Sequence, residues 1–130
     1  MTRTAHLLTL VVVFSVLSLR PADAHHPVAA KYYTDRTQAI EGNLVAFEFR
    51  NPHSFVYVEA PDDKGHVQRW TGEWIAGLQL SREAIAGTTL RAGDRVVISG
   101  YPSRNPEEHQ LRLRTITRPK DGWRWSGNFK

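Results

Sequence analysis

Alternating apolar and polar positions divide residues 40–117 into five short segments that are typical of β-strands. They cover residues 40–49, 54–60, 67–74, 95–101 and 110–117. Side chains of a strand point to opposite faces in turn, so such alternation indicates strands with one buried face. Turn-forming residues separate them, including Pro61-Asp62-Asp63-Lys64-Gly65 after the second segment.

The first segment changes phase part-way along. Ile40 and Leu44 share one parity, whereas Val45 and Phe47 share the other. A change of parity inside a strand indicates an extra residue in the ladder. The sequence therefore predicts a β-bulge near Val45-Ala46, and Asn51-Pro52 ends the strand because proline cannot donate to a ladder.

Residues 78–86 have the helical spacing that the strand segments lack. Leu78, Arg82 and Ile85 recur at intervals typical of a short helix, and Gly87 stands where a C-terminal glycine cap is expected.

The C-terminal residues 118–130 combine basic residues with Trp123 and Trp125. This tail is predicted either to fold onto the domain or to contact an anionic surface or partner.

Three strands, a helix and two further strands occur in the order of an OB-fold, a five-stranded Greek-key barrel. The predicted fold class is therefore mainly β, a single small OB-like barrel with one short helix between strands three and four. The alternative is another small antiparallel barrel or a β-sandwich.

The N-terminal residues 1–24 have the pattern of a secretory signal peptide. Arg3 precedes a 13-residue apolar run, and Ala22-Asp23-Ala24 forms a small-residue cleavage site. The run is shorter than the roughly 20 residues that a membrane-spanning helix needs. We therefore expect cleavage after Ala24, export, and one domain over residues 25–130 without a stable membrane span. The alternative is an uncleaved N-terminal anchor.

Composition narrows the classes of protein that fit. The chain has no cysteine, which excludes disulfides and thiolate metal sites. Removing residues 1–24 takes away Arg3, Arg20 and Asp23, so the formal net charge falls from +4 to +3. This mildly basic balance favours anionic surfaces only weakly, and for an exported protein we expect no nucleic-acid partner.

Cleavage after Ala24 would leave His25-His26-Pro27 as the N-terminus. A free α-amine beside imidazoles can chelate a transition metal, and nitrogen-rich tetragonal coordination favours Cu(II) or Ni(II). His53 follows a proline-fixed corner and is a candidate third ligand. The hypothesis is a Cu(II) or similar divalent metal site formed by His25, His26 and His53. The alternatives are a terminus without function and a structural role for His53 at its corner.

Aromatic residues on the second and third strands support a different hypothesis. OB barrels often bind extended polymers on this face, where Phe55, Tyr57 and Trp70 could stack on a ligand with Arg69 nearby. The partner would then be a protein or glycan. The alternative is ordinary core and cross-strand packing of these rings.

No arrangement of residues indicates catalysis. Glu48, Glu59 and Glu73 lie on predicted strands without a spacing that selects an acid–base pair. The serines lack the sequence context of an activated nucleophile. We therefore expect a binding protein and not an enzyme.

Several short motifs together resemble a family of small exported Gram-negative proteins of unknown function. They are His25-His26 directly after the signal peptide, Tyr33 and Asp35, Glu41-Gly42, Asn51-Pro52-His53 followed by Phe55 and Tyr57, Leu90 with Gly93-Asp94, and Gly100-Tyr101. Members commonly have serine where this chain has Pro27. The resemblance implies a periplasmic, OB-like β-domain and brings no established activity.

Overall fold

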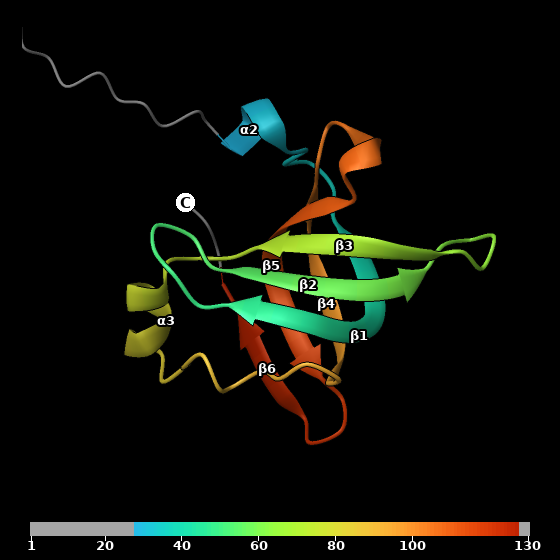
Figure 1. Cartoon of the computed structure of the whole chain (residues 1–130). Helices are drawn as coiled ribbons and strands as arrows, with labels where there is room; N and C mark the ends of the chain where they lie inside the picture. The colour runs from blue at the N-terminus through green and yellow to red at the C-terminus, as the bar shows by residue number, and fades with distance from the viewer. Residues whose placement is uncertain (1–27, 128–130) are drawn as a thin grey trace, which may run out of the picture.

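The computed structural model describes residues 28–127. Six strands and three short helical segments follow one another along the chain (Figure 1). They are α2 (Val28–Lys31), β1 (Gln38–Glu48), β2 (Phe55–Pro61), β3 (Val67–Glu73), α3 (Gly77–Arg82), β4 (Arg95–Pro102), the 3₁₀ segment η1 (Pro106–Glu108), β5 (Gln110–Arg118) and β6 (Trp123–Ser126). The five predicted strands are therefore present, and β6, α2 and η1 are additional.

A closed five-stranded barrel forms the centre of the molecule. β1 pairs with β2 and β4, β2 pairs with β3, and β4 pairs with β5, all antiparallel. A short parallel pairing of β3 with β5, from Thr71–Gln110 to Glu73–Arg112, closes the circle. With the short helix α3 between β3 and β4, this confirms the predicted OB-like barrel.

Apolar side chains fill the barrel interior, and each Å² of apolar surface that they bury stabilises the fold by about 25 cal/mol. α3 and the segment after it cover one end of the barrel, at the left of Figure 1. The buried core consists of Leu44, Val56, Val58, Trp74, Leu80, Ile85, Leu90, Val96, Ile98, Leu111, Leu113, Ile116 and Trp125.

The change of phase in β1 is a bulge, as predicted. The register with β2 shifts between Leu44 and Ala46, so Val45 is the extra residue. Leu44 is 2% exposed, and Phe47 packs on Trp74 with ring centroids 5.5 Å apart. The bulge therefore lets both halves of the strand place apolar side chains against the core.

The helix ends earlier than predicted, and Gly87 is not its cap. α3 stops at Arg82, and Ala84 takes the left-handed conformation with φ of 59°. The N–H of Ile85 donates to the carbonyl of Leu80, and that of Ala84 to Ser81. This is a Schellman motif, in which Leu80 and Ile85 make the accompanying apolar contact as buried residues. Burial of Ile85 thus fixes the end of the helix before the glycine is reached.

Replacing Ala84 by glycine is expected to raise the free energy of unfolding by up to about 1 kcal/mol, because only glycine adopts this conformation without a Cβ penalty. Urea denaturation followed by circular dichroism measures the change. Ala86→Gly, at an exposed position without a positive φ, is the control and should lower stability by roughly 0.4–1 kcal/mol. Equal losses in the two variants would contradict the assignment of a left-handed cap.

The C-terminal tail is part of the folded domain. Residues 123–126 form β6, which pairs with β5 from Thr115–Ser126 to Arg118–Trp123. Trp125 is 5% exposed and packs edge-on against Trp74, with ring centroids 5.0 Å apart. The expectation that the tail folds onto the domain is thus confirmed for β6. With only four residues, β6 is too short for its sequence pattern to indicate a strand.

No helix in the part of the chain that the structure describes is long and apolar enough to cross a membrane. The predicted signal peptide, residues 1–24, lies outside the described residues.

Candidate functional site

One buried carboxylate, Glu73, connects residues from four parts of the chain. It lies at the end of β3 and is only 9% exposed. Arg112 on β5 donates from Nη1 to Glu73 Oε1 at 2.7 Å, and the hydroxyl of Tyr32 donates to Oε2. The parallel pairing of β3 with β5 places Glu73 opposite Arg112, so the closing register of the barrel forms this ion pair.

His53 contacts the same carboxylate. Its Nδ1 lies 2.7 Å from Glu73 Oε1, and its side chain is 44% exposed. A carboxylate only accepts hydrogen bonds, so the contact places the ring proton on Nδ1 when the imidazole is neutral. The Nε2 atom is then left with a lone pair. A histidine held by a carboxylate in this way has the arrangement that metal-binding histidines commonly use.

The start of the described chain is attached to this cluster. Lys31 Nζ lies 3.9 Å from Glu73 Oε2, and Tyr32, which is 2% exposed, bridges to Ser103. Burial first, and the hydrogen bond to Glu73 second, raise the pKa of Tyr32 well above its usual range. The phenol therefore stays protonated and acts as a donor, which fixes α2 beside His53.

Within residues 28–127, no three histidine, aspartate or glutamate side chains are grouped to hold a metal ion. The cluster around Glu73 brings together two side chains of these types, His53 and Glu73. His25 and His26, the other two predicted ligands, lie outside the described residues. The three-histidine site therefore stays a prediction.

The four residues proposed for a barrel-face site do not share one face. Phe55, Tyr57 and Arg69 lie on the outer face of β2 and β3. The alternating residues Val56 and Val58 point to the inner face, where they are fully buried. Trp70 pairs with Val58 and packs against the core instead.

The outer three side chains have partners of their own. Arg50 lies over the ring of Phe55 at 4.8 Å, and Arg69 reaches Glu59 at 4.0 Å. Burial first, and then neighbouring Glu48, raise the pKa of Tyr57. Trp70 therefore lies on a different face from Phe55, Tyr57 and Arg69, whose side chains already have neighbours within the protein.

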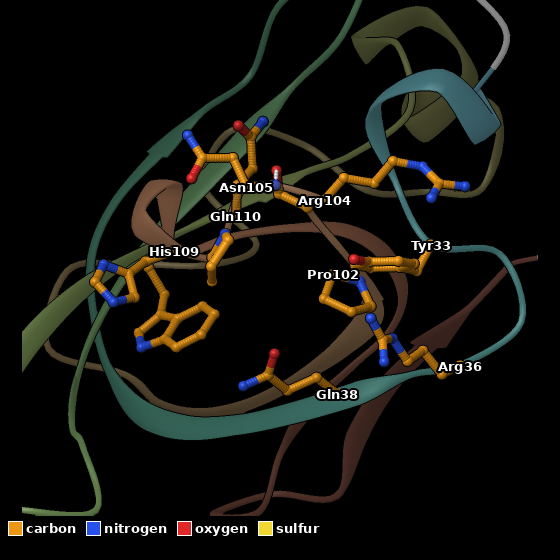
Figure 2. Close-up of a pocket in the computed structure, with 11 residues that line it drawn as sticks. Tyr33, Arg36, Gln38, Pro102, Arg104, Asn105, His109 and Gln110 are labelled. Atoms are coloured by element: carbon orange, nitrogen blue, oxygen red, sulfur yellow. Dashed lines mark hydrogen bonds between the residues drawn. The ribbon is translucent and has the colours of Figure 1, made fainter.

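Trp70 belongs to a cavity of 410 Å³ at the side of the barrel (Figure 2). Its ring meets His109 edge-on, with ring centroids 5.0 Å apart. Figure 2 shows Tyr33, Pro102 and Arg36 together on one side of the opening and His109 on another. The complete lining is Tyr33, Arg36, Gln38, Trp70, Pro102, Ser103, Arg104, Asn105, Pro106, His109 and Gln110.

A family model described as "Family of unknown function (DUF6152)" matches residues 13–112. The chain belongs to this family. The match includes the barrel from β1 to the first residues of β5 and both residues of the His53–Glu73 pair. Membership in this family of unknown function agrees with the resemblance found from the motifs. Comparison with curated proteins gave no match, and comparison with solved structures gave none either.

The sequence indicated His53 and Trp70 but not their partners. Glu73 is not distinguished in the sequence from the strand carboxylates Glu48 and Glu59, and Arg112 is not distinguished from Arg114 on the same strand. They meet because the barrel closes between β3 and β5, and the apolar–polar pattern of the sequence does not predict this pairing. Tyr33 and Arg36 line a cavity because Tyr32, directly after α2, bridges to Ser103 in the loop after β4. The Asn51-Pro52-His53 motif was the one local signal that led to the cluster.

Proposed function

We propose that this chain is an exported, periplasmic binding protein that holds Cu(II), or a similar divalent transition metal, between its processed N-terminus and His53. One observation carries the proposal. The carboxylate of Glu73 contacts His53 and, through Tyr32 and Lys31, also the first segment of the domain. The proposed role is binding and not catalysis.

Chain geometry supports a meeting of the two ends of this site. Val28 comes two positions after His26, which limits the distance between their Cα atoms to about 7 Å. From Val28 to Lys31 the chain is helical and advances only about 1.5 Å per residue. A histidine five residues before Lys31 is therefore within reach of the cluster to which Lys31 is attached.

The chemistry of the donors supports copper over harder cations. After cleavage, the α-amine of His25, the amide nitrogen of His26 and an imidazole would offer adjacent nitrogen donors, and Pro27 would end the chelate because it has no N–H. His53 would add Nε2, with Glu73 orienting its ring from Nδ1. Such nitrogen-rich sets favour Cu(II) or Ni(II), whereas Mg²⁺ and Ca²⁺ prefer oxygen.

Recognition of a protein or glycan on the outer face of β2 and β3 receives less support. Phe55 and Arg69 are occupied by Arg50 and Glu59, respectively. Trp70, the fourth residue of that hypothesis, faces the cavity described above and not this surface.

Titration of Cu(II) into protein that begins at His25 tests the proposal. We expect one tight site. His53→Ala and one extra residue before His25 should each weaken it at least about tenfold, because each change removes or displaces a donor atom. For comparison, loss of a carboxylate that hydrogen-bonds to a metal ligand by itself lowers metal affinity about 10–100-fold. Calorimetry in a weakly chelating buffer measures the affinity.

His66→Ala is the matched control, because the side chain of His66 is 73% exposed at a turn and contacts only Asp62 among the described residues. This variant should bind Cu(II) like the unchanged protein. Equal affinity in the His53→Ala variant would remove His53 from the site. Equal affinity in the extended protein would remove the free amine.

A further inference from the structure

The cavity beside Trp70 combines cationic, amide and aromatic groups, and none of the described side chains that contact Glu73 lines it. Its volume of 410 Å³ falls within the range of small-molecule sites. We propose that it binds a small organic carboxylate whose ring body carries hydroxyl groups. This inference does not depend on the proposed metal site.

Two guanidinium groups give the cavity its preference for anions. Arg36 lies over the ring of Tyr33 at 3.6 Å from the ring centre, and Arg104 lies 4.7 Å from the same centre. A guanidinium that stacks on an aromatic face keeps its N–H donors in its own plane, where they can bind a carboxylate with two hydrogen bonds. Tyr33 therefore holds two guanidinium groups at the lining of the cavity.

These charges are not neutralised from within the cavity. Of the residues that line it, none is an aspartate or glutamate in the part of the chain that the structure describes. The nearby carboxylate of Glu108 accepts a hydrogen bond from Ser103 at 2.7 Å. Arg104 uses Nε to donate to the carbonyl of Ala29 at 2.8 Å, which fixes its guanidinium 4.7 Å from the ring centre of Tyr33.

The other lining groups indicate the body of the ligand. Trp70 and Pro102 offer apolar surface, whereas Gln38, Asn105 and Gln110 offer amide donors and acceptors. Hydroxyl groups of a ring can pair with such amides while the ring itself packs on apolar side chains. A bare inorganic anion would use only the arginines.

His109 is held in a strained conformation at the same place. It ends η1 with φ of 45°, in the left-handed region, and its ring contacts Trp70. Non-glycine residues in this region persist where the surrounding structure fixes them, often at binding sites. In this conformation the imidazole lies beside the indole, and both rings line the cavity.

Nuclear magnetic resonance of the metal-free processed protein tests the inference. Glucuronate and 4-hydroxybenzoate serve as carboxylate probes with a sugar and an aromatic ring, and glucose and acetate as probes that lack the charge or the ring. We expect saturable shifts of the side-chain amide signals of Gln38 and Gln110 and of the indole N–H of Trp70 with at least one carboxylate probe. The tighter of the two identifies the ring type.

Arg36→Ala should weaken that binding about tenfold or more, because a hydrogen-bonded charge pair contributes on that scale. Arg124→Ala, at an exposed arginine on β6, should leave it unchanged. The proposal is wrong if neither carboxylate probe gives saturable shifts up to about 10 mM, if glucose or acetate binds as tightly, or if Arg36→Ala has no effect. Because no metal is present, these outcomes are independent of the copper titration.

Discussion

Glu73→Gln is expected to lower the free energy of unfolding by about 3–5 kcal/mol. The substitution keeps the size of the side chain, removes its charge and replaces one acceptor oxygen by an NH2 donor. Arg112 faces this carboxylate at 2.7 Å, and its own side chain is 9% exposed. Water therefore cannot replace the lost negative charge, and the guanidinium stays in a largely desolvated position.

The second consequence of the same change is local. Tyr32 and His53 both contact the Glu73 carboxylate, so weaker acceptance by an amide should loosen α2 as well as the corner before β2. Urea denaturation gives the global change, and hydrogen exchange of the Tyr32 and Ser54 amides reports the local one.

Glu59→Gln is the matched control on the adjacent strand. Its pair with Arg69 is 4.0 Å long, with both side chains at least half exposed, so the change should stay within about 0.5 kcal/mol. Similar small losses in both variants would contradict the account of Glu73 as the central group of the cluster. If Glu73→Gln does not fold, Tyr32→Phe, which removes one hydrogen bond, should still cost about 1 kcal/mol.

Trp125→Ala is expected to cost about 3–5 kcal/mol, as large aromatic truncations in a core do. Trp125 fills the space beside Trp74, and its indole N–H donates to Glu83 at 2.6 Å. The change would thus leave a cavity and separate β6 from the segment after α3. Fluorescence-detected urea denaturation measures it, with circular dichroism as a second probe.

Arg124→Ala, one residue away on the exposed side of β6, should change stability by less than about 0.5 kcal/mol. If the alanine variant does not fold, Trp125→Phe keeps most of the ring and should lose about 1–3 kcal/mol. A loss below about 1 kcal/mol for Trp125→Ala would mean that β6 is dispensable to the domain.

Local pattern predicted those parts of the fold whose cause is local. The parity change between Leu44 and Val45 marked the bulge, and Gly65, which has a positive φ, lies in the turn that was expected after the second segment. The end of α3 was missed because burial of Ile85 decides it, with Ala84 accepting an unfavourable conformation. β6 was missed because its four residues are held by β5 and by the core, and not by their own pattern.

The candidate sites depend even more on contacts between distant segments. His53 is visible in the sequence, but its orientation comes from Glu73, twenty residues later, and from Arg112 on β5. The cavity likewise brings Arg104, from the loop after β4, to the ring of Tyr33, which Arg36 covers from three residues away in the sequence. Neither spacing nor composition specifies such meetings. The closing register between β3 and β5 creates the first, and the bridge between Tyr32 and Ser103 creates the second.

Pulsed electron paramagnetic resonance of the Cu(II) complex, which counts the imidazoles bound to the metal, tests the central claim most directly. Protein that begins at His25 should show at least two imidazoles, and His53→Ala should show one fewer at the same copper occupancy. An identical imidazole count in the two proteins would mean that His53 does not bind the metal and that the cluster around Glu73 serves only to fix the barrel.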